Sequence, residues 1–239
     1  MSGVGLTLES LLTRSENREK SGAVTCDYEN NLCTMSEGAI RLSTEENAGG
    51  SSTLSEAHSL NLIQQILPKV LLKETEKQIG YRNPGGKITD YTIWFQECKF
   101  GVQVTRAMYR PKDRQSASRT APVKRGREQV VRKRLAKEME KKLKGIQESS
   151  RNACDPWEKQ ILHVWCQDNT LCEIVRDVFD NADTGLRGNT ILLTSQVQGQ
   201  HLWETIFYNT AVRRFNTHVS HDEQCHVLES HPVPRPRKR

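Results

Sequence analysis

The sequence predicts an α/β fold in which a central mixed sheet is flanked by helices. Residues 88–108, ITDYTIWFQECKFGVQVTRAM, contain two apolar runs separated by the polar patch QECK, which indicates an antiparallel hairpin. Further along the chain, predicted strands alternate with predicted helices, as they do when crossover connections join parallel strands. A sheet that combines both kinds of pairing and is covered by helices accommodates this order.

The individual elements follow from the spacing of apolar residues. Residues 53–79 place apolar side chains three and four positions apart, which predicts a helix that Pro68 kinks or splits. Residues 127–146 carry a second such stripe, on a helix whose other faces are densely basic. Later elements are predicted strands at 159–167 and 189–196, a helix at 171–183, and an apolar segment of undetermined type at 201–209.

Composition divides the 239 residues into three parts. Residues 1–52 hold few large apolar residues after Leu12, which predicts a disordered leader containing one short helix near its start. Residues 53–211 hold every predicted strand and form the α/β domain. Residues 212–239 are polar, rich in His, and end in PRPRKR, which predicts a disordered basic tail.

Several classes of protein are excluded by the same composition. No apolar run approaches the roughly 18 residues that span a bilayer. The first residues lack the basic region and apolar core of a secretory signal. The seven cysteines are scattered and form no CxxC pair, which indicates reduced thiols. We therefore expect a cytoplasmic or nuclear protein, and the basic PRPRKR end is compatible with nuclear import.

Positive charge is concentrated between Arg106 and Lys144. This stretch holds 15 Lys and Arg residues against 4 Asp and Glu, although the whole chain carries a net charge of only +6. Such a concentration predicts a polyanion partner, DNA or RNA. The plain alternative is a solvated helix face without a polyanion role. The predicted nucleic-acid-binding residues are Arg106, Arg132, Lys133, Arg134, Lys141 and Lys142.

One face of the predicted hairpin is polar. If positions 97–98 form the turn, Asp90 lies opposite Thr105 and Thr92 lies opposite Gln103, so these four side chains make one polar cluster. The other face is mostly apolar and can pack under helices. A sheet edge that faces solvent would show the same alternation. The cluster by itself is therefore only a candidate site.

A helix with an acidic residue, followed by Asp90 on one strand and Val102-Gln103-Val104-Thr105 on the next, resembles the PD-(D/E)xK nuclease fold. The resemblance covers residues 53–196 and implies a restriction-endonuclease-like core. In that family the second strand reads apolar-Glu-apolar-Lys, so Gln103 replaces the Glu and Thr105 replaces the Lys. The upstream acid would be Glu56, which could instead be the capping-box partner of Thr53.

The resemblance implies a metal-dependent nuclease. Asp90 would offer a carboxylate and Gln103 a carbonyl oxygen to Mg²⁺ or Mn²⁺, and such a metal polarises the phosphate and activates water. A basic residue such as Lys141 or Lys142 would have to stand in for the missing lysine. The implied catalytic residues are Glu56, Asp90, Gln103 and Thr105, with Asp90 and Gln103 at the metal.

Two other functions fit the same departures from the family pattern. One is a catalytically inactive relative that binds nucleic acid or a protein. The other is a plain α/β interaction domain with no polyanion role.

Overall fold

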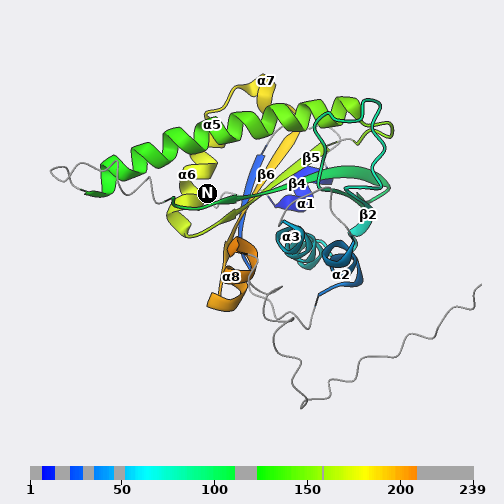
Figure 1. The fold of residues 1–239 in the computed structure, drawn as a ribbon, viewed down its shortest axis with the longest axis horizontal. Coiled ribbons are helices and arrows are strands. Elements are labelled where there is room, and N and C mark those ends of the chain that lie inside the picture. The colour runs from blue at the N-terminus through cyan, green and yellow to red at the C-terminus, as the bar shows by residue number, and fades with distance from the viewer. Residues whose placement is uncertain are drawn as a thin grey trace, which may run out of the picture. The chain divides into compact units, whose positions relative to one another are not determined.

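The computed structural model describes residues 7–13, 22–28, 35–45, 52–110, 123–157 and 159–208, which all belong to one unit, Met1–Asn209. At its centre lies a six-stranded sheet with the order β1-β6-β5-β4-β3-β2 (Figure 1). The first four strands in this order, β1, β6, β5 and β4, are parallel to one another. Strand β3 pairs antiparallel with β4, and β2 pairs antiparallel with β3. The strands are β1 (Gly22–Tyr28), β2 (Leu71–Thr75), β3 (Tyr91–Phe95), β4 (Cys98–Ala107), β5 (Lys159–Cys166) and β6 (Thr190–Val197).

Helices cover both faces of this sheet (Figure 1). One face carries α1 (Leu8–Thr13), α2 (Glu37–Thr44), α3 (Thr53–Ile66) and α8 (Gln200–Tyr208). The other carries α5 (Val123–Asn152), α6 (Asn169–Asp180) and α7 (Thr184–Arg187). The predicted α/β fold, a mixed sheet flanked by helices, is confirmed. No described helix is long and apolar enough to cross a bilayer.

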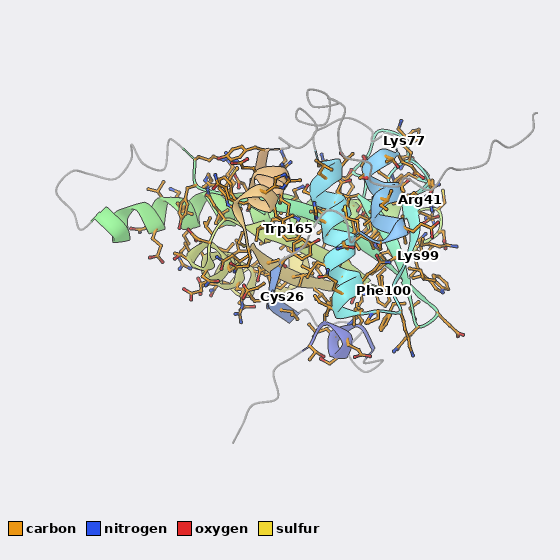
Figure 2. All side chains as sticks on the ribbon, turned by 90° about the horizontal axis from the view of Figure 1, so that it is seen from below. Cys26, Arg41, Lys77, Lys99, Phe100 and Trp165 are labelled. Atoms are coloured by element: carbon orange, nitrogen blue, oxygen red, sulfur yellow. The ribbon has the colours of Figure 1, made fainter. Side chains whose placement is uncertain are left out.

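Two apolar cores hold the layers together, one on each face. On the first face, Phe100 of β4 and Trp165 of β5 are almost completely buried against α3 and its neighbours (both are labelled in Figure 2). On the second, the apolar stripe of α5 packs on β5, β6 and α6. All eight residues of β5 are buried, as expected for a parallel strand covered on both sides. The buried stripe of α5 comprises Val131, Leu135, Met139, Leu143 and Ile146.

The prediction of a disordered leader is wrong for two segments of residues 1–52, because residues 22–28 and 37–44 form β1 and α2. The short helix expected near its start is α1, residues 8–13. Strand β1 pairs in parallel with β6, from Gly22 opposite Ile191 to Tyr28 opposite Val197. Its partner lies so far along the chain that local composition carries no sign of the pairing. The predicted tail, residues 212–239, lies outside the described residues.

The prediction of one helix over residues 53–79 is also wrong in its second half. Helix α3 ends at Ile66, and residues 71–75 form β2, which pairs with β3. Pro68 lacks the amide hydrogen that would continue the helix, and the chain turns there, with Val70 N donating to Leu67 O at 3.0 Å. The apolar residues after Pro68 matched a helical spacing without belonging to a helix.

Candidate functional site

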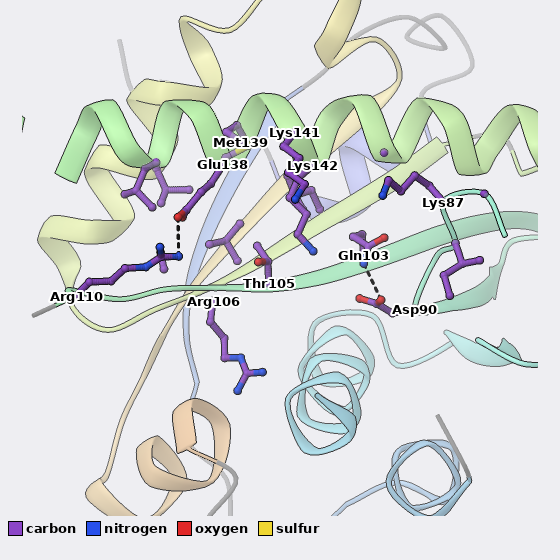
Figure 3. Close-up of a pocket in the computed structure, with 18 residues that line it drawn as sticks. Lys87, Asp90, Gln103, Thr105, Arg106, Arg110, Glu138, Met139, Lys141 and Lys142 are labelled. Atoms are coloured by element: carbon purple, nitrogen blue, oxygen red, sulfur yellow. Dashed lines mark hydrogen bonds and ion pairs between the residues drawn. The ribbon is translucent and has the colours of Figure 1, made fainter. Parts of the chain in front are cut away.

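A hollow of about 650 Å³ lies between β4 and α5, and we call it the α5–β4 hollow. The loop before β3 forms one end, α5 forms the roof, and β5 and α6 supply apolar side chains at the back. Its polar lining contains residues from the predicted hairpin and from the basic helix (Figure 3). These residues are Lys87, Asp90, Gln103, Thr105, Arg106, Arg110, Glu138, Lys141 and Lys142.

Asp90 is fixed at one end of the hollow by two hydrogen bonds. Its Oδ1 accepts from Gln103 Nε2 at 2.6 Å, and its Oδ2 accepts from the backbone amide of Val104 at 2.5 Å (Figure 3). Burial raises the pKa of Asp90 to about 6, although the Val104 hydrogen bond and the charge of Lys142 act to lower it. The carboxylate is thus tied to β4 and is mostly ionised at pH 7.

The predicted hairpin register is wrong by two residues. Tyr91 lies opposite Val102 and Thr92 opposite Gly101, so Asp90 comes beside Gln103 instead of Thr105. Thr92 leaves the cluster, since its hydroxyl donates to Glu74 Oε2 at 2.9 Å. A shift of two residues keeps every side chain on its face, which is why alternation alone could not distinguish the registers.

The turn and one buried lysine favour the observed register. Gln96 and Glu97 form the two-residue turn, with φ of 48° and 64°, as a type I′ hairpin requires. Lys99 then lies opposite Trp94, and its ammonium reaches Glu74 Oε2 at 2.6 Å and Asp155 Oδ2 at 2.9 Å. A buried ammonium group needs such partners, because an unpaired buried charge is costly.

Glu56 lies on α3 and is not part of the lining of the hollow. Its side chain is 4% exposed, and burial, followed by the charge of Asp90, raises its pKa to about 8. The structure thus brings Glu56 within electrostatic range of Asp90 and keeps it protonated at pH 7. The capping box with Thr53 is not formed, because Ser52 is the N-cap residue and makes no side-chain capping bond.

Arg106 and Thr105 leave β4 toward opposite faces. Thr105 lines the hollow, whereas the guanidinium of Arg106 points away from α5 (Figure 3). Arg106 Nη1 donates to the carbonyls of Ile206 at 3.0 Å and Phe207 at 3.4 Å, near the C-terminal end of α8. Cations are favourable at this end of a helix. The structure therefore assigns this arginine a role in holding α8.

The predicted basic residues of α5 separate into two groups. Arg132 pairs with Asp177 and Glu128, and Arg134 pairs with Glu138 and donates to the carbonyl of Met108. Lys133 is exposed outside the hollow. Only Lys141 and Lys142 line the hollow, across from Gln103 and Asp90 (Figure 3).

Sequence reasoning missed two cations that line the hollow. Lys87 lies in the loop before β3, and Arg110 lies after β4, where it pairs with Glu138 at 2.6 Å. Neither residue belongs to a periodic pattern, so each needs the fold to place it. Each of them follows or precedes the hairpin closely in the sequence, and this position is the one feature that could have pointed to them.

The residues of the site do not fit the Mg²⁺ that the family resemblance implies. Mg²⁺ is usually held by one or two ionised carboxylates together with water and phosphate oxygens. Both oxygens of Asp90 already accept hydrogen bonds, and Glu56 is protonated at pH 7. Within the part of the chain that the structure describes, no group of three His, Cys, Asp or Glu could hold a metal ion.

Comparisons with known proteins add little to this geometry. No family model matches the chain. The AAC-rich mRNA clone AAC4 protein of Dictyostelium discoideum is 32% identical over 160 residues, which is 66% of this chain but 22% of that protein. The chain thus spans about a fifth of the curated relative it matches.

Among solved structures, the chain is similar to SfsA of Pyrococcus furiosus in complex with Ca²⁺. The likeness covers 60% of this chain and 56% of SfsA, at 11% identity and a TM-score of 0.29. A similarity of this size carries no argument about function. The candidate site therefore depends on its own geometry.

Proposed function

We propose that this protein binds the phosphate backbone of a nucleic acid in the α5–β4 hollow, without needing a metal ion. The observation that carries the proposal is the placement of Lys87, Lys141 and Lys142 in one hollow. None of these three lysines forms an ion pair with another described residue. Their ammonium groups are thus available for phosphate oxygens.

The acidic residues of the hollow do not cancel this charge. Glu138 is paired with Arg110 and Arg134, and the single charge of Asp90 offsets only one of the three lysines. The hollow therefore keeps a positive excess next to a low-dielectric apolar wall, which strengthens attraction for an anion. Backbone phosphates bound in this way displace counterions, so affinity falls steeply with salt.

Metal-dependent cleavage is a second candidate, and one observation favours it. The charge of Lys142 lowers the pKa of Asp90, so this lysine lies where it could stand in for the family lysine that Thr105 replaces. The poor fit of the carboxylates to Mg²⁺ speaks against this candidate. Both functions use the same hollow and are separated by assaying cleavage and binding side by side.

The test measures binding of labelled duplex and single-stranded DNA and RNA by fluorescence anisotropy over a range of salt concentrations. The double substitution Lys141→Gln and Lys142→Gln should weaken binding by about 10- to 100-fold and reduce the salt slope by about 2. The matched control, Lys69→Gln and Lys137→Gln, removes the same charge from exposed sites outside the hollow and should change affinity by less than about threefold.

Three outcomes contradict the proposal. Equal losses in both double variants would mean that binding follows total charge and not the hollow. No binding by the folded wild-type protein would favour the alternative of a plain interaction domain without a polyanion role. Cleavage with Mg²⁺ or Mn²⁺ by the wild type, lost in Asp90→Asn, would establish the nuclease.

A further inference from the structure

A second hollow, of about 150 Å³, lies between the C-terminal half of α5 and the first residues of β5 and β6. We call it the α5–β6 hollow. None of the residues that line it also lines the α5–β4 hollow. The role of this second hollow is therefore independent of the proposed function.

Three side chains of the α5–β6 hollow carry buried polar atoms without a hydrogen-bond partner in the chain. Gln160 is 3% exposed, and neither its Oε1 nor its Nε2 is paired. Trp157 is 6% exposed with an unpaired Nε1, and Nε of Arg187 is also unpaired. Because buried polar groups are normally hydrogen-bonded, four such atoms around one hollow indicate a missing partner.

The backbone around the hollow keeps these atoms in place. Because Gly101 of β4 has no side chain, there is room for these atoms. A Cβ at this position would lie 2.3 Å from Gln160 Oε1 and 2.6 Å from Trp157 Nε1. On the opposite wall, Gln147 Nε2 donates to the carbonyls of Gly185 and Leu186, which ties α7 to α5. The hollow is thus a preformed feature of the fold.

The charges around the hollow favour an anion. Arg151 and Arg187 line it, and no carboxylate is found among its described lining residues. Arg187 has a loose ion pair with Asp180, whose Oδ1 is 3.9 Å from Nη1 and whose side chain is 59% exposed. Lys159 adds little, because its ammonium already donates to the carbonyl of Leu11 at 2.9 Å.

The geometry points to a binding site for a phosphate group, either free phosphate or the monoester end of a larger ligand. Three donors, on Trp157, Gln160 and Arg187, would each meet a phosphate oxygen, with the guanidinium of Arg151 adding charge. Gln160 Oε1, an unpaired acceptor, would take a hydrogen bond from the hydroxyl that hydrogen phosphate keeps at neutral pH and that a monoester keeps in its monoanion. Sulfate has no proton at neutral pH and leaves that acceptor unpaired.

The experiment titrates the full chain with inorganic phosphate, and separately with sulfate and AMP, by calorimetry and by thermal unfolding. Phosphate should bind and raise the unfolding midpoint, and sulfate should bind more weakly. Gln160→Leu and Arg187→Met should each lower phosphate affinity by about tenfold or more. Trp157→Phe keeps an aromatic ring but loses the five-membered ring that carries the N–H, and it covers the case in which the other variants fail to fold.

Controls separate this site from general charge and from the α5–β4 hollow. Arg176→Met removes an exposed arginine of α6 and should leave phosphate affinity within about twofold. Nucleic-acid binding should be unchanged in Gln160→Leu, so either proposal can fail alone. Competition between AMP and phosphate would identify a phosphorylated ligand, and binding of phosphate alone would identify the free ion.

The main alternative is that ordered water serves the unpaired atoms, since 150 Å³ has room for about five waters. In that case phosphate would neither bind nor stabilise the wild-type protein, and Gln160→Leu would raise its unfolding temperature. That result overturns the inference. Sulfate binding as tightly as phosphate would overturn it as well, because the hydroxyl would then play no part.

Discussion

The two faces of the sheet both hold polar side chains, but these side chains differ in whether they have partners within the protein. On the α3 face, Tyr91 Oη and Ser59 Oγ lie 2.8 Å apart, Ser59 Oγ is 2.6 Å from His163 Nδ1, and His163 Nε2 is 3.0 Å from Ser195 Oγ. On the α5 face, Lys87, Lys141 and Lys142 line a hollow and form no ion pair with another described residue. The lack of a partner within the described residues, more than polarity, therefore distinguishes a candidate site from a structural network.

The network on the α3 face gives the largest expected effect. Burial lowers the pKa of His163 to about 3, so its neutral ring can donate with one nitrogen and accept with the other. His163→Ala would leave two buried hydroxyls short of a partner and create a cavity, which should lower the free energy of unfolding by about 3 kcal/mol. Urea denaturation measures this.

The control for the network is His201→Ala, since His201 is exposed on α8. It should change the free energy of unfolding by less than about 0.5 kcal/mol. Equal effects of the two substitutions would show that the α3 face does not depend on this network.

Glu56 tests what happens when a buried acid on the α3 face cannot ionise easily. Its pKa is raised to about 8 in the folded protein, so the folded state binds more protons than the unfolded state above pH 4.5. Stability should therefore fall as pH rises toward 8, by about 2 kcal/mol between pH 6 and pH 8. Denaturation at several pH values measures the profile.

Glu56→Gln removes this titration and should flatten the profile over the same range. Asp90 titrates with the same sign, but its pKa of about 6 places most of its effect at lower pH. Parallel profiles for the wild type and Glu56→Gln would show that Glu56 is ionised normally.

Two lysines on the α5 side of the sheet, one with ion-pair partners and one in the α5–β4 hollow, should respond differently to substitution. Lys99 is buried and paired with Glu74 and Asp155, so Lys99→Met should lower the free energy of unfolding by about 1–2 kcal/mol. Lys142→Met should change it by less than about 0.5 kcal/mol and should instead weaken nucleic-acid binding. A large loss of stability in Lys142→Met would mark this lysine as structural.

The smallest effect is expected on the outer part of α5. Arg132 pairs with Asp177 and Glu128 at a partly exposed position, where ion pairs contribute little. Arg132→Gln should change the free energy of unfolding by less than about 1 kcal/mol and nucleic-acid affinity by less than about twofold. A tenfold loss of affinity would extend the binding surface beyond the hollow.

The spacing of apolar residues predicted those elements whose conformation depends mainly on residues close by in the sequence. The apolar stripe of α5, the hairpin and strands β5 and β6 lie where periodicity placed them. Strand β1 was missed because its pairing with β6 is remote in sequence, and β2 was missed because its apolar residues coincided with a helical spacing.

The candidate site was predicted in part. Asp90, Gln103 and Thr105 do line one hollow with Lys141 and Lys142, but the guanidinium of Arg106 points away from it and holds α8. The register depended on which two residues form the turn, and residue type gave no clear signal there, since neither Gln96 nor Glu97 is a usual choice for positive φ.

The pairing of β1 with β6 also affects how the protein is made. Thr25 and Thr194, whose hydroxyls lie 2.7 Å apart, are separated by 169 positions in the chain. At about 5–20 residues per second, a ribosome needs roughly ten to thirty seconds to synthesise the strand that β1 must join. Throughout that interval the first strand has no partner, and it is the kind of segment that a chaperone would need to shield.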